Sequence, residues 1–286
     1  MNQEAQSLLL ELFYFELSDK LWVRCFQLFL ESIIIMTFAL GLPLLLGLEQ
    51  GGIITLFLYS ASLLVRMQFL IDEHRDNVWG KGWDQGLDNW RAHWIFATSA
   101  TAMFLGMLLT IQLFYAFLPK ATGSQFFGFV LRMNSLQQDL PLVERFGPIL
   151  SVLGNNILVL MTALILTFLY RSLGMILILS WNAFVWAVVF GVLFRDTASP
   201  DSVPGWLFVT YGICGVTPHL LVETLAYIVG SMAALFLSKA VTKYEVSDER
   251  FKSSTFSAGQ LLLTALLLLS LAAVLESFLP RWLIPT

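Results

Sequence analysis

The sequence predicts an all-α protein, a polytopic transmembrane helical bundle that forms a single membrane domain over residues 1–286 and has about six to seven spans. Of the 286 residues, 57% are hydrophobic and only 13% are charged, whereas a soluble domain carries about 25% charged residues. The mean hydropathy is +0.76. The apolar residues also come in blocks of about 20, which is the length that crosses the hydrocarbon of a bilayer.

Residues 1–25 are expected to form an amphipathic helix that lies at the membrane surface. Leu and Phe side chains alternate there with Glu11, Glu16, Asp19, Lys20 and Arg24, and this mixture is typical of interfacial helices. The segment is acidic at its start and has no basic stretch before an apolar core, so it does not resemble a cleaved signal peptide.

Residues 26–118 predict three spans, at about 26–48, 53–71 and 94–118. Glu31 interrupts the first span near its start. Arg66 lies near the end of the second, where a long side chain is expected to reach back to the interface. Between the second and third spans, residues 72–94 are polar and rich in Gly and Trp, which predicts a surface loop with interfacial Trp anchors. The spacing of its acidic residues and His74 matches no oxygen-ligand metal loop.

Residues 119–147 predict an interfacial linker, and 148–286 carry the remaining spans, at about 149–170, 173–194, 218–239 and 258–279. The apolar stretch at 205–241 is too long for one ordinary span and too short for two. Thr217 is a good N-cap and Pro218 is favoured at a first helical position. A broken or re-entrant half-element over 206–216 is therefore expected before Pro218.

The distribution of positive charge predicts the orientation. With the N-terminus cytoplasmic and the half-element re-entrant, most of the 16 Lys and Arg residues fall on the cytoplasmic side, as the positive-inside rule requires. If the half-element crossed fully, the basic residues would divide evenly. The sequence therefore favours a multi-pass protein of the cell membrane with seven spans, a cytoplasmic N-terminus and an external C-terminus.

Polar residues inside the C-terminal spans are the candidate functional residues, because ionisable groups in a bilayer are costly and rare. With this orientation most of them fall in the outer part of the bilayer, within roughly 10 Å of its surface, and Asn182 lies deeper. They are Asn155, Asn156, Asn182, His219, Glu223 and Glu276.

Two interpretations of this set stay open. His219 and Glu223 are four residues apart and share a helix face, so together with Glu276 they are candidate ligands for a cation or carriers of a proton. The set lacks a paired metal motif such as HExxH. Alternatively, buried Asn, His and Glu side chains hold helices together through hydrogen bonds and have no further function.

Other classes of function find little support. A formal net charge of −4 argues against nucleic acid as a partner. Cys25 and Cys214 are too few for a disulfide framework or a metal knuckle. No nucleophile elbow, P-loop or nucleotide fingerprint occurs. We therefore expect no enzymatic activity and no cofactor, with a bound cation the one ligand left open.

Four stretches at these same residues resemble the stage II sporulation protein M family of membrane proteins. They are GPILSVLGNNILVLMTALIL with its Asn pair, LILSWNAFVWAVVFGVL with its single Asn, GVTPHLLVETLAYIVGSMAALFLSKAV with Pro-His-x-x-x-Glu, and LLSLAAVLESFLPRWL with Ala-Ala-x-x-Glu. Together they cover about residues 147–283, and the N-terminal spans are similar only in hydropathy. The family usually has Gly after the His, where this chain has Leu220.

The resemblance implies a non-enzymatic membrane scaffold or anchor for partner proteins. In endospore formers the family member acts with peptidoglycan-degrading partners, but relatives occur in organisms that form no spores, so a sporulation role is not carried over. The alternative is an ion- or proton-coupled transporter or channel-like protein that uses the His and Glu residues. Expected partners are the lipid bilayer and either other proteins or further copies of the chain.

Overall fold

The computed structural model describes residues 16–79, 86–130, 142–192 and 204–278, and the described residues form helices joined by short turns, without strands. The bundle is all-α, as predicted. In chain order its helices are α2 (Leu21–Leu45), α3 (Gly51–Trp79), α4 (Gly86–Phe117), α5 (Lys120–Phe126), α7 (Leu142–Tyr170), α8 (Ser172–Gly191), α9 (Gly205–Lys243) and α10 (Glu249–Ser277).

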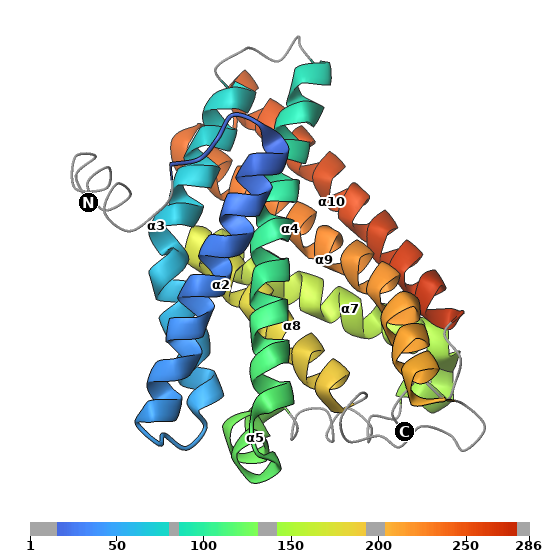
Figure 1. Cartoon of the computed structure of the whole chain (residues 1–286). Coiled ribbons are helices and arrows are strands. Elements are labelled where there is room, and N and C mark those ends of the chain that lie inside the picture. Colours follow the sequence, from blue (N-terminus) through green and yellow to red (C-terminus); the bar gives the residue numbers. More distant parts are fainter. Residues whose placement is uncertain (1–15, 80–85, 131–141, 193–203, 279–286) are drawn as a thin grey trace.

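The helices form two associated groups. Helices α2, α3 and α4 stand side by side, whereas α9 and α10 run obliquely to them and α7 and α8 lie between (Figure 1). One apolar core runs from α2 to α10 and includes Leu28, Tyr59, Phe104 and Phe184. A second, smaller core joins α7, α9 and α10 alone. The second core includes Tyr227, which belongs to the candidate site described below.

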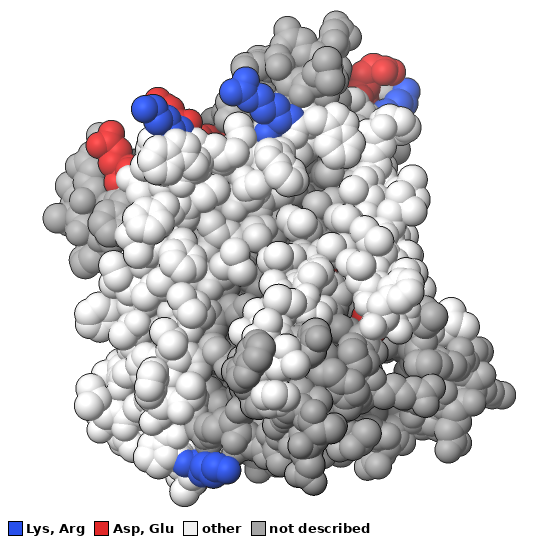
Figure 2. All heavy atoms as spheres, turned by 45° about the vertical axis from the view of Figure 1, so that its right-hand side comes forward, with Lys and Arg blue, Asp and Glu red and all other residues white. Residues whose placement is uncertain are grey.

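Seven of the helices are long and apolar enough to cross a membrane. In the view of Figure 2 charged side chains gather at one end of the molecule, a Lys or Arg lies at the opposite end, and the described surface between them is mostly uncharged. Lys20, Lys243, Arg250 and Lys252 lie at the end where α2 and α10 begin, which we call the basic end. The multi-pass arrangement predicted from hydropathy is confirmed.

The beginning of the first span differs from the prediction. Helix α2 starts at Leu21, so residues 21–25 belong to the first span and not to an interfacial helix. Residues 16–20 are not helical, and 1–15 lie outside the described part of the chain. The apolar run that begins at Leu21 tolerates Arg24 inside the helix because Arg24 donates hydrogen bonds to both carboxylate oxygens of Glu73 on α3.

The polar segment at 72–94 is mostly helical, which corrects the prediction of a loop. Helix α3 continues to Trp79 and α4 already begins at Gly86, with residues 80–85 outside the described part. The stretches suitable for membrane crossing end at His74 and resume at Trp90. The polar residues therefore extend two membrane helices beyond the bilayer, where an established helix needs no apolar sequence to continue.

The prediction of a broken or re-entrant half-element before Pro218 is wrong. Helix α9 runs without interruption from Gly205 to Lys243, with Pro218 inside it. Proline removes one helical hydrogen bond. A complete break in a bilayer would leave several backbone groups without partners and no water to satisfy them, so continuing the helix is cheaper. Its 39 residues span about 58 Å, which is far longer than the hydrocarbon thickness and agrees with its oblique course.

The predicted linker at 119–147 is partly described. The short helix α5 lies at the end opposite the basic end (Figure 1). It packs on the start of α3, because a Cβ atom added at Gly51 would meet the Phe126 ring at 2.2 Å. Residues 131–141 lie outside the described part, and the chain is helical again from Leu142.

Candidate functional site

Helices α7, α9 and α10 meet in a defined register. A Cβ atom added at Gly230 on α9 would lie 2.4 Å from Leu160 Cδ1 on α7 and 3.7 Å from Ala265 Cβ on α10. Eight residues along, Ser238 donates a hydrogen bond of 2.9 Å to the carbonyl of Phe168. Helices α7 and α9 are therefore parallel and in constant register, and α10 runs antiparallel to both. The small residue at Gly230 permits the close approach.

A carboxylate cluster lies two turns from this contact, toward the end opposite the basic end. Tyr227 donates a hydrogen bond of 2.8 Å to Glu223 Oε1, and both side chains are buried. Glu276, half-buried in the last turn of α10, is close enough for its charge to act on both Glu223 and Tyr227. The two acidic residues come from different helices and are within range of each other's charge, and among the described residues neither has a salt bridge to Lys or Arg.

His219 faces a different neighbour. Its ring lies edge-on to Trp186 of α8, with 5.1 Å between the ring centroids. The side chain is 2% exposed, and neither ring nitrogen has a hydrogen-bond partner among the described residues. The four-residue spacing keeps His219 and Glu223 on one side of α9, but their neighbours belong to α8 and α10 respectively.

The three Asn residues behave differently from one another. Asn156 is buried and lies one turn before Leu160 on α7, so the register places it at the level of Ala226 on α9. Asn155 is exposed. Asn182 is buried in α8, but its side-chain amide donates a 2.7 Å hydrogen bond to the carbonyl of Ile178, one turn earlier. The register thus brings Asn156 to the level of the carboxylate cluster along α9.

The structure does not support a metal site built from His219, Glu223 and Glu276. Within the described ranges, no group of three His, Cys, Asp or Glu side chains is arranged to hold a metal ion. The imidazole ring packs edge-on against Trp186 of α8. The hypothesis from the sequence considered spacing but not the direction of each side chain. Residues four apart on an α-helix still point about 40° away from each other around the helix axis.

A buried ion pair in the N-terminal helices was missed by the sequence reasoning. Arg66 donates from Nε to Glu31 Oε1 and from Nη2 to Glu31 Oε2, both at 2.9 Å, with each residue 3% exposed or less. Arg66 therefore does not extend to the interface as predicted, because its partner on α2 lies at the same depth. The sequence did contain a signal for this ion pair, because Glu31 and Arg66 fall at matching depths in two consecutive antiparallel spans.

Two histidines near the basic end form a further polar contact that the sequence did not indicate. His74 Nε2 and His93 Nδ1 are 2.9 Å apart, which joins α3 to α4. His74 is buried, and both rings contact Phe236 of α9 edge-on. Lys239, one turn after Phe236, has its Nζ 3.9 Å from Asp72 Oδ1. The pair lies at the junction of three helices and on the side opposite the carboxylate cluster.

The comparisons agree with this architecture. The profile of the family described as Stage II sporulation protein M matches residues 94–281. The match covers α4 to α10 and therefore begins well before residue 147, where the resemblance in the sequence begins. No curated protein and no solved structure matches the chain. Because the match spans more than half of the sequence, this seven-span chain belongs to the stage II sporulation protein M family.

Proposed function

We propose that this protein is a non-enzymatic scaffold or anchor in the cell membrane, which holds partner proteins at its surface. The observation that carries the proposal is that several buried polar and charged side chains inside the spans bond to neighbouring helices. Glu31 pairs with Arg66, Arg24 with Glu73, and Ser32 hydrogen-bonds to both Tyr59 and the carbonyl of Met103. Such contacts between helices fix their packing, and a scaffold needs a rigid body of this kind.

The continuous helix α9 supports the same proposal. Transporters typically place interrupted helices at their binding sites, and the interruption expected at Pro218 is absent from the described helix. Within the part of the chain that the structure describes, His219, Glu223 and Glu276 are also not grouped as three ligands of one metal ion. Both features that favoured transport in the sequence are therefore weaker once the structure is considered.

A surface for partners is available at the basic end. The turn between α9 and α10 carries Val246, whose side chain is 74% exposed, between charged residues. An apolar side chain in a turn outside the spans is not needed for contact with lipid tails, so Val246 is available to a protein partner. We propose that this turn contacts a protein partner.

Photo-crosslinking in cells tests the scaffold proposal. A photoreactive amino acid at Val246 is expected to give one discrete protein adduct, whereas the same residue at Phe38, which is 75% exposed within a span of α2, is expected to give none. Discrete adducts at neither position would contradict the proposed turn as a docking surface.

The carboxylate cluster favours proton or cation coupling as the second candidate function. Glu223 and Glu276 lie within range of each other's charge and without a described Lys or Arg partner, and intramembrane carboxylates of this kind occur in proton relays. Purified protein in vesicles loaded with a pH-sensitive dye separates the two candidates. Proton flux that is lost in Glu223→Gln, while thermal unfolding stays cooperative, would favour coupling. Equal behaviour of wild type, Glu223→Gln and empty vesicles is expected for a scaffold.

A further inference from the structure

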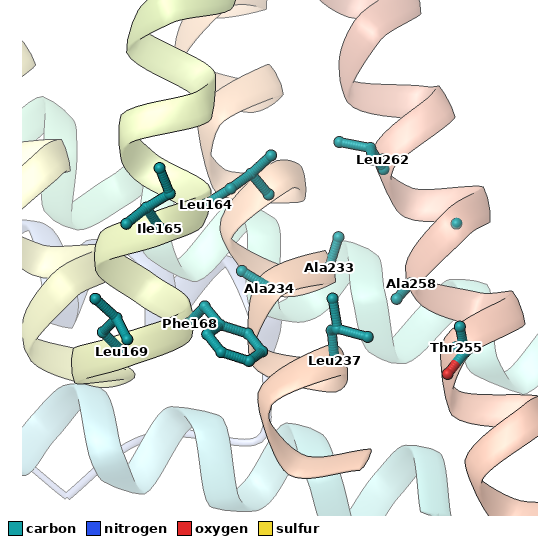
Figure 3. A pocket seen from close by; sticks show the side chains of 11 residues that line it. Leu164, Ile165, Phe168, Leu169, Ala233, Ala234, Leu237, Thr255, Ala258 and Leu262 are labelled. Carbon is teal, nitrogen blue, oxygen red and sulfur yellow. The ribbon is translucent and has the colours of Figure 1, made fainter. Parts of the chain in front are cut away.

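An apolar groove opens on the side of the bundle between α7, α9 and α10. Its volume is about 430 Å³, which is in the range of small-molecule sites. Side chains from all three helices border the same space (Figure 3). The lining residues are Leu164, Ile165, Phe168, Leu169, Ala233, Ala234, Leu237, Thr255, Ala258, Gly259 and Leu262.

The groove has a floor of small residues and walls of large ones. Ala233, Ala234 and Ala258 are buried, whereas Ile165 and Leu169 on α7 are more than half exposed. A Cβ atom added at Gly259 would meet no atom within 4 Å, so the space in front of this glycine is open. All of these residues lie within helices long and apolar enough to cross the membrane. In a bilayer the groove is therefore in direct contact with lipid tails.

One end of the groove is directed to the basic end of the molecule. On α10 the lining residues Thr255, Gly259 and Leu262 follow the spacing of one helix face, and Lys252 continues that face by one turn. Lys252 therefore stands beside the groove where α10 begins.

We infer that the groove binds a single phospholipid, with one acyl chain between α7, α9 and α10 and the phosphate next to Lys252. Charge complementarity decides in favour of this occupant. Lys252 donates to Glu249 at 3.1 Å, but these side chains are 61% and 90% exposed, and a pair that exposed contributes little to stability. A phosphate can replace Glu249 at small cost. Acidic residues also occur at this end, but the face that leads into the groove carries Lys252.

The length of the groove agrees with part of one acyl chain. Its α10 side runs from Thr255 to Leu262, which is about 10 Å along the helix. Flexible Leu and Phe walls adjust to an unbranched chain, and the nearly unbroken apolar lining offers it no polar contact to lose. Thr255 is at the end nearest Lys252, where the glycerol backbone and its ester groups would lie.

Photolabelling in vesicles tests the inference. Full-length protein is reconstituted in phosphatidylethanolamine and phosphatidylglycerol that contain a trace of phospholipid with a diazirine on the acyl chain, and labelled peptides are mapped by mass spectrometry. We expect label to concentrate at 164–169 and 255–262. In Gly259→Phe, which fills the groove, this label is expected to fall to the level of the outward helix faces. The matched control Leu263→Phe adds an aromatic ring at a residue of α10 that is 60% exposed and does not line the groove, and should retain the label.

A second pair of variants tests the phosphate contact. Each basic residue near an anionic headgroup contributes about 1 kcal/mol, so Lys252→Ala should lower groove labelling about fivefold at limiting probe. Lys243→Ala, at the end of α9 and outside the groove lining, should leave it unchanged. A diazirine diacylglycerol without phosphate is expected to label the groove weakly, with no response to Lys252→Ala. If phosphatidylethanolamine and phosphatidylglycerol probes label the groove equally, the protein recognises the phosphate. If the phosphatidylglycerol probe labels it more strongly, the protein recognises the net negative charge of the lipid. Either result supports the inference.

Two outcomes would overturn it. Label spread evenly over all outward faces, and unaffected by Gly259→Phe, would mean that the groove holds only bulk lipid. Gly259→Cys in a Cys25→Ala, Cys214→Ala background would instead form disulfide-linked dimers if a second copy of the chain filled the groove. Thermal unfolding of each variant in the same detergent verifies that it is folded, and Gly259→Leu serves in place of Gly259→Phe if the aromatic side chain prevents folding.

Discussion

Arg66 and Glu31 join α3 to α2 through two parallel hydrogen bonds of 2.9 Å inside the bundle. Both side chains are less than 5% exposed. The guanidinium fork matches a carboxylate in a fixed geometry, which makes such a bidentate pair strong and directional. The pair therefore fixes the relative rotation and depth of the first two spans.

Removing one member of this pair should be more harmful than removing both. Arg66→Met alone leaves Glu31 buried without its partner, and losses of about 3–5 kcal/mol in the free energy of unfolding are typical in that case. The double variant Glu31→Leu, Arg66→Met should recover most of this loss. Thermal unfolding of the purified proteins in one detergent measures both. Additive losses in the double variant would show that the two residues act independently.

The carboxylate cluster should respond in opposite ways to changes at Tyr227 and Glu276. Tyr227→Phe removes the recorded donor to Glu223 and should cost about 1–3 kcal/mol, the penalty for a buried polar group left unsatisfied. Glu276→Gln keeps the size of the side chain and removes a nearby like charge, so it should be neutral or stabilising, most clearly at high pH where both carboxyls are ionised. Unfolding temperatures measured across a pH series test both, and a large loss in Glu276→Gln would refute the repulsion.

Close packing of α2 on α4 predicts a strong effect at Gly106. A Cβ atom there would lie 2.6 Å from the backbone oxygen of Phe29 and 2.8 Å from Ser32 Cβ. Gly106→Ala should therefore separate the helices and destabilise the protein by about 1–3 kcal/mol. Gly41→Ala is the matched control within α2, because its Cβ would meet nothing within 4 Å, and it should raise helix stability by up to about 1 kcal/mol. Similar melting temperatures for the two variants would contradict this packing.

Cysteine labelling tests the proposed orientation, in which the N-terminus is cytoplasmic. In a Cys25→Ala, Cys214→Ala background, Lys120→Cys at the start of α5 and Lys252→Cys on α10 lie at opposite ends of the bundle. A membrane-impermeant maleimide added to intact cells should label only Lys120→Cys, because the basic end faces the cytoplasm by the positive-inside rule. Labelling of Lys252→Cys in intact cells would reverse the orientation.

The sequence predicted which helices carry the candidate residues. Glu223 lies in α9 and Glu276 in the last turn of α10, within range of each other's charge, and whether they act as one site stays a prediction. Their approach follows from span order and depth, which hydropathy supplies. The direction of His219 toward Trp186 depends on the rotation of α9 about its own axis. Rotation is set by packing against α8 and α10, about which hydropathy carries no information.

By itself, the sequence determined that this is a helical membrane protein of the stage II sporulation protein M family, because a bilayer requires apolar segments of a certain length and leaves few alternatives to helices. Only the tertiary structure decided that α9 passes through Pro218 unbroken, that Arg66 turns inward to Glu31, and that His74 meets His93. Each of these depends on whether a neighbouring helix supplies a partner at the same depth. That information lies in contacts between segments far apart in the chain, which local composition and periodicity do not record.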